Sequence, residues 1–143
     1  MEFSRLKMFL IDTNIFLELL LDQKRAEECE QLLDKVAKGD VEAVVTSFTI
    51  HAVEAILNNS KLVLTFLRNV ENSLGLSIYD TTIDDQQAVA ILMEEKKLDF
   101  DDCLQYYVAK KLGAEAIISF DKHFNGLDVP RKEPEEILSS LKR

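Results

Sequence analysis

The chain has 143 residues, enough for one domain with a sizeable hydrophobic core. Its composition, 47% hydrophobic and 30% charged with only 4 Gly and 2 Pro, excludes a disordered or fibrous protein. The formal net charge of −9 argues against a protein that holds nucleic acid by surface charge alone, although carboxylates that bind divalent cations can still bridge to phosphate.

The first predicted strand covers residues 7–12. Its apolar run stops at Asp12, too soon for a signal peptide or a membrane span, so we expect a cytoplasmic protein without a membrane partner. Helical spacing follows to about residue 21 and again over residues 24–38, where Gly39 breaks it.

Short apolar runs and helical stretches alternate through the rest of the chain. Further strands are expected over residues 43–46, 75–79, 116–120 and, as a short fifth strand, 127–129. Helices are expected over residues 47–57, 61–73, 84–96, 101–112 and 135–141, the first of them capped by Ser47. No repeat or linker rich in Gly, Ser or Pro interrupts these elements, so we expect a single domain over residues 1–143.

Strands that alternate with helices indicate an α/β fold. We expect a three-layer α/β/α arrangement, in which a central, mostly parallel sheet of four to five strands lies between helices. Ligands of such sheets bind beyond the carboxyl ends of the strands, at a point where the strand order switches.

Two aspartates directly follow predicted strands. Asp12 comes after the run Met-Phe-Leu-Ile, and Asp121 comes after Ile-Ile-Ser-Phe. Their carboxylates are therefore expected to share one cleft at the carboxyl edge of the sheet. The alternative is that each aspartate only caps the helix that follows it, because Asp accepts hydrogen bonds from free amides and suits the positive helix end.

Glu54 is a further candidate. It lies in the helical stretch TSFTIHAVEAIL among small and apolar neighbours, which is unusual for a solvated face, although an ordinary surface glutamate on an amphipathic helix remains the alternative. His51, three residues earlier, is placed to flank the same site, or is a structural or exposed histidine.

Three aspartates begin the helix expected over residues 101–112. Asp99 and Asp102 resemble a capping arrangement, and three acids exceed what capping requires. Asp102 adjoins the apolar stripe at Cys103, so we expect it to point across the top of the sheet while Asp101 faces water.

The two cysteines give no sign of a cross-link or a metal. Cys29 and Cys103 lie far apart, without a CxxC motif or a histidine pattern. We therefore expect neither a disulfide nor a zinc site, and two free thiols in or near the core.

Four motifs occur in a fixed order along nearly the whole chain: FLIDTNIFLELL, TSFTIHAVEAIL, DFDDCLQYYVAKKLGA and AIISFDKHF. Together they resemble the PIN-domain family of nucleases and, within it, the small VapC-type toxins. The order and separation of the motifs are more specific than any one of them.

The resemblance implies an acidic quartet and polar residues beside it. By position, the quartet is Asp12, Glu54, Asp102 and Asp121, and the supporting residues are Thr13, Asn14 and Ser119. The chain departs from the family pattern in carrying an extra acid at Asp101 and a cysteine at Cys103, and it matches only loosely around Glu54.

Such a quartet suits hydrolysis of a phosphodiester. Divalent metals lower the pKa of water and stabilise charge on phosphoryl oxygens, and Mg²⁺ or Mn²⁺ prefers a few carboxylates around an open position. We expect Asp12, Asp102 and Asp121 to hold the metal and Glu54 to complete or orient its shell. Without metal these carboxylates would raise one another's pKa.

The activity implied by the resemblance is that of a metal-dependent endoribonuclease, the toxin of a toxin-antitoxin pair, which leaves a 3′-hydroxyl and a 5′-phosphate. The resemblance also implies a homodimer and an antitoxin that inserts a segment over the acidic site. Basic residues are candidate phosphate contacts, or simply solvated surface: Lys61, Arg68, Lys110, Lys111 and Lys122.

Other functions were weighed against this one. The first alternative is a catalytically silent PIN-like module for RNA binding or assembly, which metal-dependent cleavage would exclude. A phosphatase of the haloacid-dehalogenase type needs a second Asp where Asn14 stands, and a receiver domain needs a phosphorylatable Asp on a middle strand and a late lysine. A nucleotide-binding protein of the P-loop type would need a Gly-rich loop, which the sequence lacks.

Overall fold

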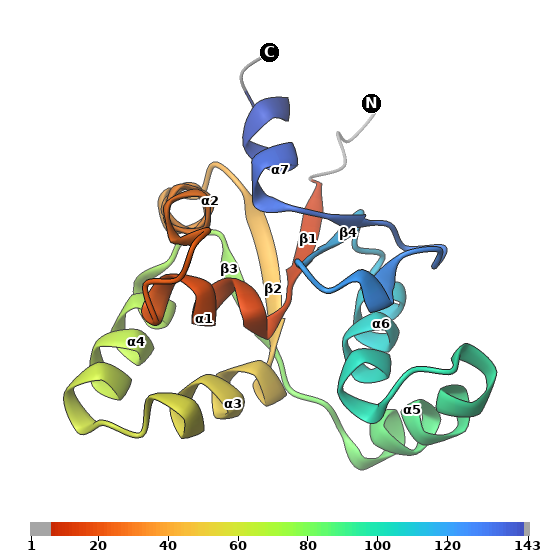
Figure 1. Ribbon diagram of the computed structural model, residues 1–143. Coiled ribbons are helices and arrows are strands. Elements are labelled where there is room, and N and C mark those ends of the chain that lie inside the picture. The colour runs from red at the N-terminus through yellow and green to blue at the C-terminus, as the bar shows by residue number, and fades with distance from the viewer. Residues whose placement is uncertain (1–6, 142–143) are drawn as a thin grey trace, which may run out of the picture.

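A computed structural model describes residues 7–141 of the chain. A five-stranded sheet lies at its centre between two layers of helices (Figure 1). In sheet order the strands are β3 (Leu76–Tyr79), β2 (Glu42–Thr46), β1 (Met8–Ile11), β4 (Ala116–Ile118) and β5 (Arg131–Lys132). Every neighbouring pair is parallel, which confirms the predicted α/β fold with a parallel central sheet.

Within residues 7–141, seven helices and one 3₁₀ turn accompany the strands, and all but the last of them lie between strands in the sequence. They are α1 (Thr13–Leu20), α2 (Ala26–Lys38), α3 (Ser47–Leu57), α4 (Ser60–Asn72), α5 (Ile83–Lys96), α6 (Phe100–Leu112), η1 (Lys122–Phe124) and α7 (Pro134–Ser140). Gly39 and Gly113 end α2 and α6 with positive φ angles, a conformation that glycine adopts without strain.

The side chains of the central strand β1 alternate between two hydrophobic cores. Phe9 and Ile11 pack in the core formed with α1, α2, α3, α4 and α7, while Leu10 packs in the core formed with α5 and α6. This period of two is what a strand covered on both faces requires. Figure 1 shows the same division, with α1 to α4 on one side of the sheet and α5 and α6 on the other.

The fifth strand lies four residues later than predicted. Residues 127–129 form no strand; Arg131 and Lys132 pair with β4 instead, through bonds such as that from Ser119 N to the carbonyl of Lys132. The apolar run was misleading because Val129 is buried as a loop residue. The cap of α3 also differs, since Thr46, not Ser47, accepts the hydrogen bond from Thr49 N.

One glycine allows a close approach of two backbones. Gly75 precedes β3, and its N–H donates to the carbonyl of Val36 at the end of α2 over 2.9 Å. A Cβ at this position would lie 2.2 Å from the carbonyl oxygen of Val41 and 2.8 Å from that of Val36. The sharp junction of α2, β2 and β3 therefore depends on the absence of a side chain.

The strand order switches at β1. The chain goes from β1 to β2 and β3 on one side, and later enters β4 and β5 on the other. The carboxyl ends of β1 and β4 therefore flank the place where parallel sheets of this type bind ligands. Among residues 7–141, no helix has both the length and the apolar character that crossing a membrane would require.

Candidate active site

Asp12 lies at the switch point, between β1 and α1, and its side chain is only 8% exposed. Its Oδ1 accepts a hydrogen bond from Thr13 N at 2.8 Å, so the capping role that we considered is present. Its Oδ2 accepts a second bond from Ser119 Oγ at 2.7 Å. Burial raises the pKa of Asp12 to about 6, the two hydrogen bonds oppose that rise, and the charges of Asp102 and Asp121 add to it.

Ser119 is the centre of a polar cluster at the end of β4. It is fully buried and donates to Asp12, and its oxygen accepts from Asn14 Nδ2 at 3.1 Å and from Asp121 N at 2.9 Å. The hydroxyl therefore joins both predicted strand-end aspartates and the polar residue at position 14. Thr13, Asn14 and Ser119, the supporting residues expected from the sequence, each hydrogen-bond to Asp12 or to one another.

A second buried polar network lies behind Asp12. Gln105 of α6 donates from Nε2 to Thr49 Oγ1 at 2.7 Å and approaches Asp12 Oδ1 at 3.5 Å. The hydroxyls of Thr13 and Thr49 are 2.9 Å apart, and Thr46 donates to Gln105 Oε1 at 3.3 Å. A buried polar group without a partner costs stability, whereas a network in which all groups are paired holds its side chains rigidly.

The sequence analysis missed Gln105 and Thr49. A signal was available, because Gln105 follows Asp102 by three residues and therefore lies on the same side of α6. Thr49 likewise stands one turn before the fully buried Val53. Polar residues on a buried helix face need partners, and here the partners are the groups around Asp12.

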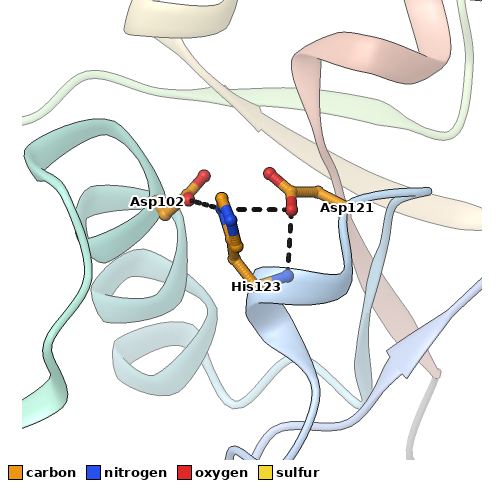
Figure 2. Close-up of side chains that lie close together, drawn as sticks. All are labelled: Asp102, Asp121 and His123. Atoms are coloured by element: carbon orange, nitrogen blue, oxygen red, sulfur yellow. Dashed lines mark hydrogen bonds and ion pairs between the residues drawn. The ribbon is translucent and has the colours of Figure 1, made fainter.

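Asp102 of α6 converges with Asp121 and His123 of the segment around η1 (Figure 2). Asp102 lies in the first turn of α6, where Asp99 caps its N–H, and Asp121 caps η1 by accepting from His123 N at 2.9 Å. The ring nitrogen His123 Nδ1 is 3.1 Å from Asp102 Oδ2 and 3.2 Å from Asp121 Oδ1.

Burial, hydrogen bonding and neighbouring charges perturb the pKa values of Asp102 and His123. Desolvation raises the pKa of Asp102, while its hydrogen bond with His123 opposes the rise. The pKa of His123 is raised, chiefly by the bond to Asp102 and then by the charge of Asp121. The positively charged, protonated form of His123 is therefore favoured between the two carboxylates in the metal-free protein.

Glu54 does not join the aspartates. Its carboxylate pairs with His51 Nδ1 at 3.0 Å on the same helix, and among residues 7–141 the group of side chains that could hold a metal contains Asp102, Asp121 and His123 but not Glu54. Five residues separate Glu54 from Thr49, which is about 140° around the helix and about 7.5 Å along it. Thr49 faces the site, so Glu54 faces elsewhere.

The basic residues considered as phosphate contacts lie in three places. Lys61 and Arg68 are exposed on α4. Lys110 and Lys111 form ion pairs with Asp128 and Asp85, respectively, and the Lys111 ammonium also lies near two tyrosine rings. Lys122 is exposed and is the residue between Asp121 and His123 in the sequence. It is the basic residue adjacent to the site.

The donor atoms fit a divalent cation. One carboxylate oxygen each of Asp102 and Asp121 and one ring nitrogen of His123 all lie within 4.8 Å of one another. Neighbouring ligands of an octahedral ion with bonds of about 2.1 Å are about 3 Å apart, close to the two nitrogen–oxygen distances of 3.1 and 3.2 Å. Asp12 is not part of this group of three, but it lies near enough for the charges of Asp102 and Asp121 to raise its pKa.

Comparison with known families decides the identity of the fold. The family model described as PIN domain matches residues 9–130, which include all three aspartates. The chain belongs to the PIN-domain family. The family resemblance predicted from the four sequence motifs is thereby confirmed.

Solved structures resemble this PIN domain at low sequence identity. A toxin–antitoxin complex from Klebsiella pneumoniae aligns with TM-score 0.68 and 19% identity over 87% of this chain and 96% of the other. VapC20 of Mycobacterium tuberculosis, described as a toxin that cleaves the sarcin–ricin loop, aligns with TM-score 0.62 and 15% identity over 79% and 89%. VapBC2 of Rickettsia felis, solved with a promoter DNA fragment, aligns with TM-score 0.62 and 15% identity over 88% and 98%.

At these identities the likeness establishes the PIN fold. None of the curated proteins is a significant sequence match to this chain. The chemistry of this PIN domain therefore has to be argued from its own side chains.

Proposed function

We propose that this PIN domain is a metal-dependent endoribonuclease whose acidic site consists of Asp12, Asp102 and Asp121. The observation that carries the proposal is the convergence of three carboxylates at the switch point of the sheet, close enough for Asp102 and Asp121 to raise the pKa of Asp12. Like charges gathered in this way are unfavourable unless a cation joins them.

The residues have distinct roles in this proposal. Asp102 and Asp121 would hold the metal, and Asp12, fixed by Ser119 and Thr13, would complete the acidic site. When bound, a divalent ion supplies Lewis-acid stabilisation of the phosphoryl oxygens and a water of lowered pKa. Water then adds to phosphorus, the bond to the 3′ oxygen breaks, and that oxygen takes a proton to give a 3′-hydroxyl and a 5′-phosphate.

An acidic protein can bind RNA if a divalent cation at the acidic site contacts the phosphate. A chain of net charge −9 repels phosphate, so substrate binding has to pass through a cation at the acidic site. Lys122, exposed next to the acidic residues, offers a direct phosphate contact in addition. Binding should consequently weaken when the metal is removed as well as when salt is raised.

Cleavage of a mixed cellular RNA pool tests the proposal. Purified protein is incubated with Mg²⁺, with Mn²⁺ and with EDTA, beside Asp12→Asn and the control Asp101→Asn, whose carboxylate is an exposed neighbour of Asp102. We expect discrete metal-dependent products from the wild type and from Asp101→Asn, and none from Asp12→Asn. Products that persist in EDTA or in Asp12→Asn would contradict the proposal, and no cleavage under any condition would favour a silent RNA-binding or assembly module.

We further infer that the chain acts as the toxin of a toxin-antitoxin pair. Support comes from its fold, since structures that resemble it are described as toxin–antitoxin or VapBC assemblies. Induced expression should arrest bacterial growth, and Asp12→Asn should not. A cytoplasmic homodimer, the other property implied by the resemblance, is tested by light scattering of the purified protein, which should give twice the chain mass of 16.3 kDa.

A further inference from the structure

The geometry points to His123 as a nitrogen ligand in the metal site, and we propose that this ligand makes the site select Mn²⁺ and other transition-metal ions over Mg²⁺. The inference rests on the metal site of the proposed function and adds to it a ligand and a preference. Neither the acidic quartet expected from the family nor the sequence motifs assigned a role to this histidine.

The backbone of His123 is fixed by a hydrogen bond on its N-terminal side and by a buried residue on its C-terminal side. Asp121 Oδ1 accepts from His123 N at 2.9 Å, and the next residue, Phe124, is fully buried in the core. A single 3₁₀ turn thus carries both the capping aspartate and the imidazole. The ring nitrogen Nδ1 consequently faces the carboxylates of Asp102 and Asp121 together (Figure 2).

The arrangement has no evident structural purpose. The His123 side chain is 70% exposed, against 14% for Asp102 and 30% for Asp121, so the imidazole fills no space in the core. Ion pairs in such exposed positions contribute little to stability. The distances of 3.1 and 3.2 Å are, however, those of neighbouring ligands around a six-coordinate ion with bonds of about 2.1 Å.

The donor set determines which ion is preferred. Mg²⁺ takes oxygen ligands almost exclusively and retains several waters, so an imidazole adds little to its binding. Mn²⁺ accepts the same oxygen ligands and, as a first-row transition metal, also gains affinity from a nitrogen ligand, although less than Fe²⁺, Ni²⁺ or Zn²⁺ does. Two carboxylates and one imidazole therefore discriminate against Mg²⁺, whereas three carboxylates would not.

The chain provides its own control for the experiment. It contains two histidines, and the other one, His51, is 78% exposed and pairs with Glu54 on α3. Mn²⁺ is paramagnetic and broadens the proton resonances of a coordinated ring. In an NMR titration of the wild type with Mn²⁺, we expect the ring protons of His123 to broaden first and those of His51 to remain sharp.

Affinities measured by calorimetry complete the test, with no reference to RNA cleavage. His123→Asn should lower the affinity for Mn²⁺ by about tenfold or more and change that for Mg²⁺ by less than about threefold, because only the nitrogen is lost. His123→Asp restores an oxygen ligand and should shift the preference toward Mg²⁺. His51→Asn should leave both affinities unchanged. Thermal unfolding of each variant verifies that the fold is intact.

The possible failures are distinguishable. If His123→Asn binds Mn²⁺ as tightly as the wild type does, the histidine is no ligand and its ring only pairs with the carboxylates; the acidic metal site then stands without it. If the His123 ring stays sharp in the presence of Mn²⁺, no ion binds between Asp102 and Asp121, and the metal site itself is contradicted. If the wild type binds neither ion, the metal site and the proposed function fail together with this inference.

Discussion

Ser119 donates a hydrogen bond of 2.7 Å to Asp12, although 107 residues separate the two in the sequence. The bond crosses from the end of β4 to the end of β1, the two strands that flank the switch point. Because both side chains are buried, the orientation of the Asp12 carboxylate is set before any ligand arrives.

Replacement of Ser119 by Ala should therefore damage the site more than the fold. The variant leaves an oxygen of Asp12 and the amides of Asn14 and Asp121 without their shared partner. Loss of a residue that orients an acidic ligand typically reduces metal affinity or activity by about 10- to 100-fold, and an unpaired buried group costs about 1–3 kcal/mol of stability.

The measurement is the rate of metal-dependent RNA cleavage together with urea unfolding. Ser47→Ala serves as the control, because Ser47 also donates to an aspartate, Asp80 at 2.8 Å, but on the exposed surface. A cleavage rate in Ser119→Ala equal to that of the control would show that the orientation of Asp12 is not important.

Asp12→Asn should stabilise the metal-free protein, and the gain should depend on pH. The folded state raises the pKa of Asp12 from 3.8 to about 6, so the charged carboxylate costs stability as the pH rises through this interval. Below about pH 4 the carboxyl is neutral in both states and the two proteins should differ little on this account. Above about pH 6 the variant should gain up to about 3 kcal/mol.

Urea unfolding in EDTA between pH 4 and pH 7.5 tests this dependence, since other titrating groups cancel in the difference between wild type and variant. A difference in unfolding free energy that stays constant over the whole range would be incompatible with a buried Asp12 carboxylate that titrates near pH 6.

Glu54→Gln is expected to retain nuclease activity within about a factor of three of the wild type. The physical reason is the orientation of α3: the side chain pairs with His51 and lies about 140° around the helix from Thr49. Cleavage assays beside Asp102→Asn decide the matter, because the latter should be inactive. A hundredfold loss in Glu54→Gln would restore the four-acid site inferred from the family.

Gly75→Ala should destabilise the fold by about 1–3 kcal/mol, since the new methyl group would meet two carbonyl oxygens that belong to backbone and cannot move aside. Gly126→Ala is the matched control: its φ of +83° imposes backbone strain, but its Cβ would meet nothing within 4 Å. Chemical denaturation of both variants should rank Gly75→Ala as the less stable, and the reverse order would refute the argument from close approach.

The strands and helices were predictable because each carries its own signal. The runs that became β1, β2, β3 and β4 are apolar and short, and the helices between them show 3.6-residue spacing. The fifth strand escaped detection because Arg131 and Lys132 join the edge of the sheet through backbone hydrogen bonds, which hydrophobicity does not report.

The sequence located site residues from the expected fold only where a residue with suitable chemistry directly follows a predicted strand. Asp12 and Asp121 follow strands, so the rule for parallel sheets located them. Glu54 was chosen for its apolar neighbours, a criterion that ignores the rotation of the helix. His123 owes its position to partners far away in the sequence, and no local pattern contains that information. Gln105 was indicated locally only by its three-residue spacing from Asp102, and its partners Thr49 and Asp12 are distant in the sequence.

The order of the strands also determines how late in synthesis the acidic cluster can form. Asp12 emerges early from the ribosome, but its neighbours at positions 102, 119 and 121 are synthesised last, and β1 lacks one of its two flanking strands until then. Domains fold as units during synthesis, so a truncated or unfinished chain has no assembled acidic cluster. If the chain is a nuclease toxin, it stays inactive until residues 102–121 have been synthesised and folded. An antitoxin can be made during that time.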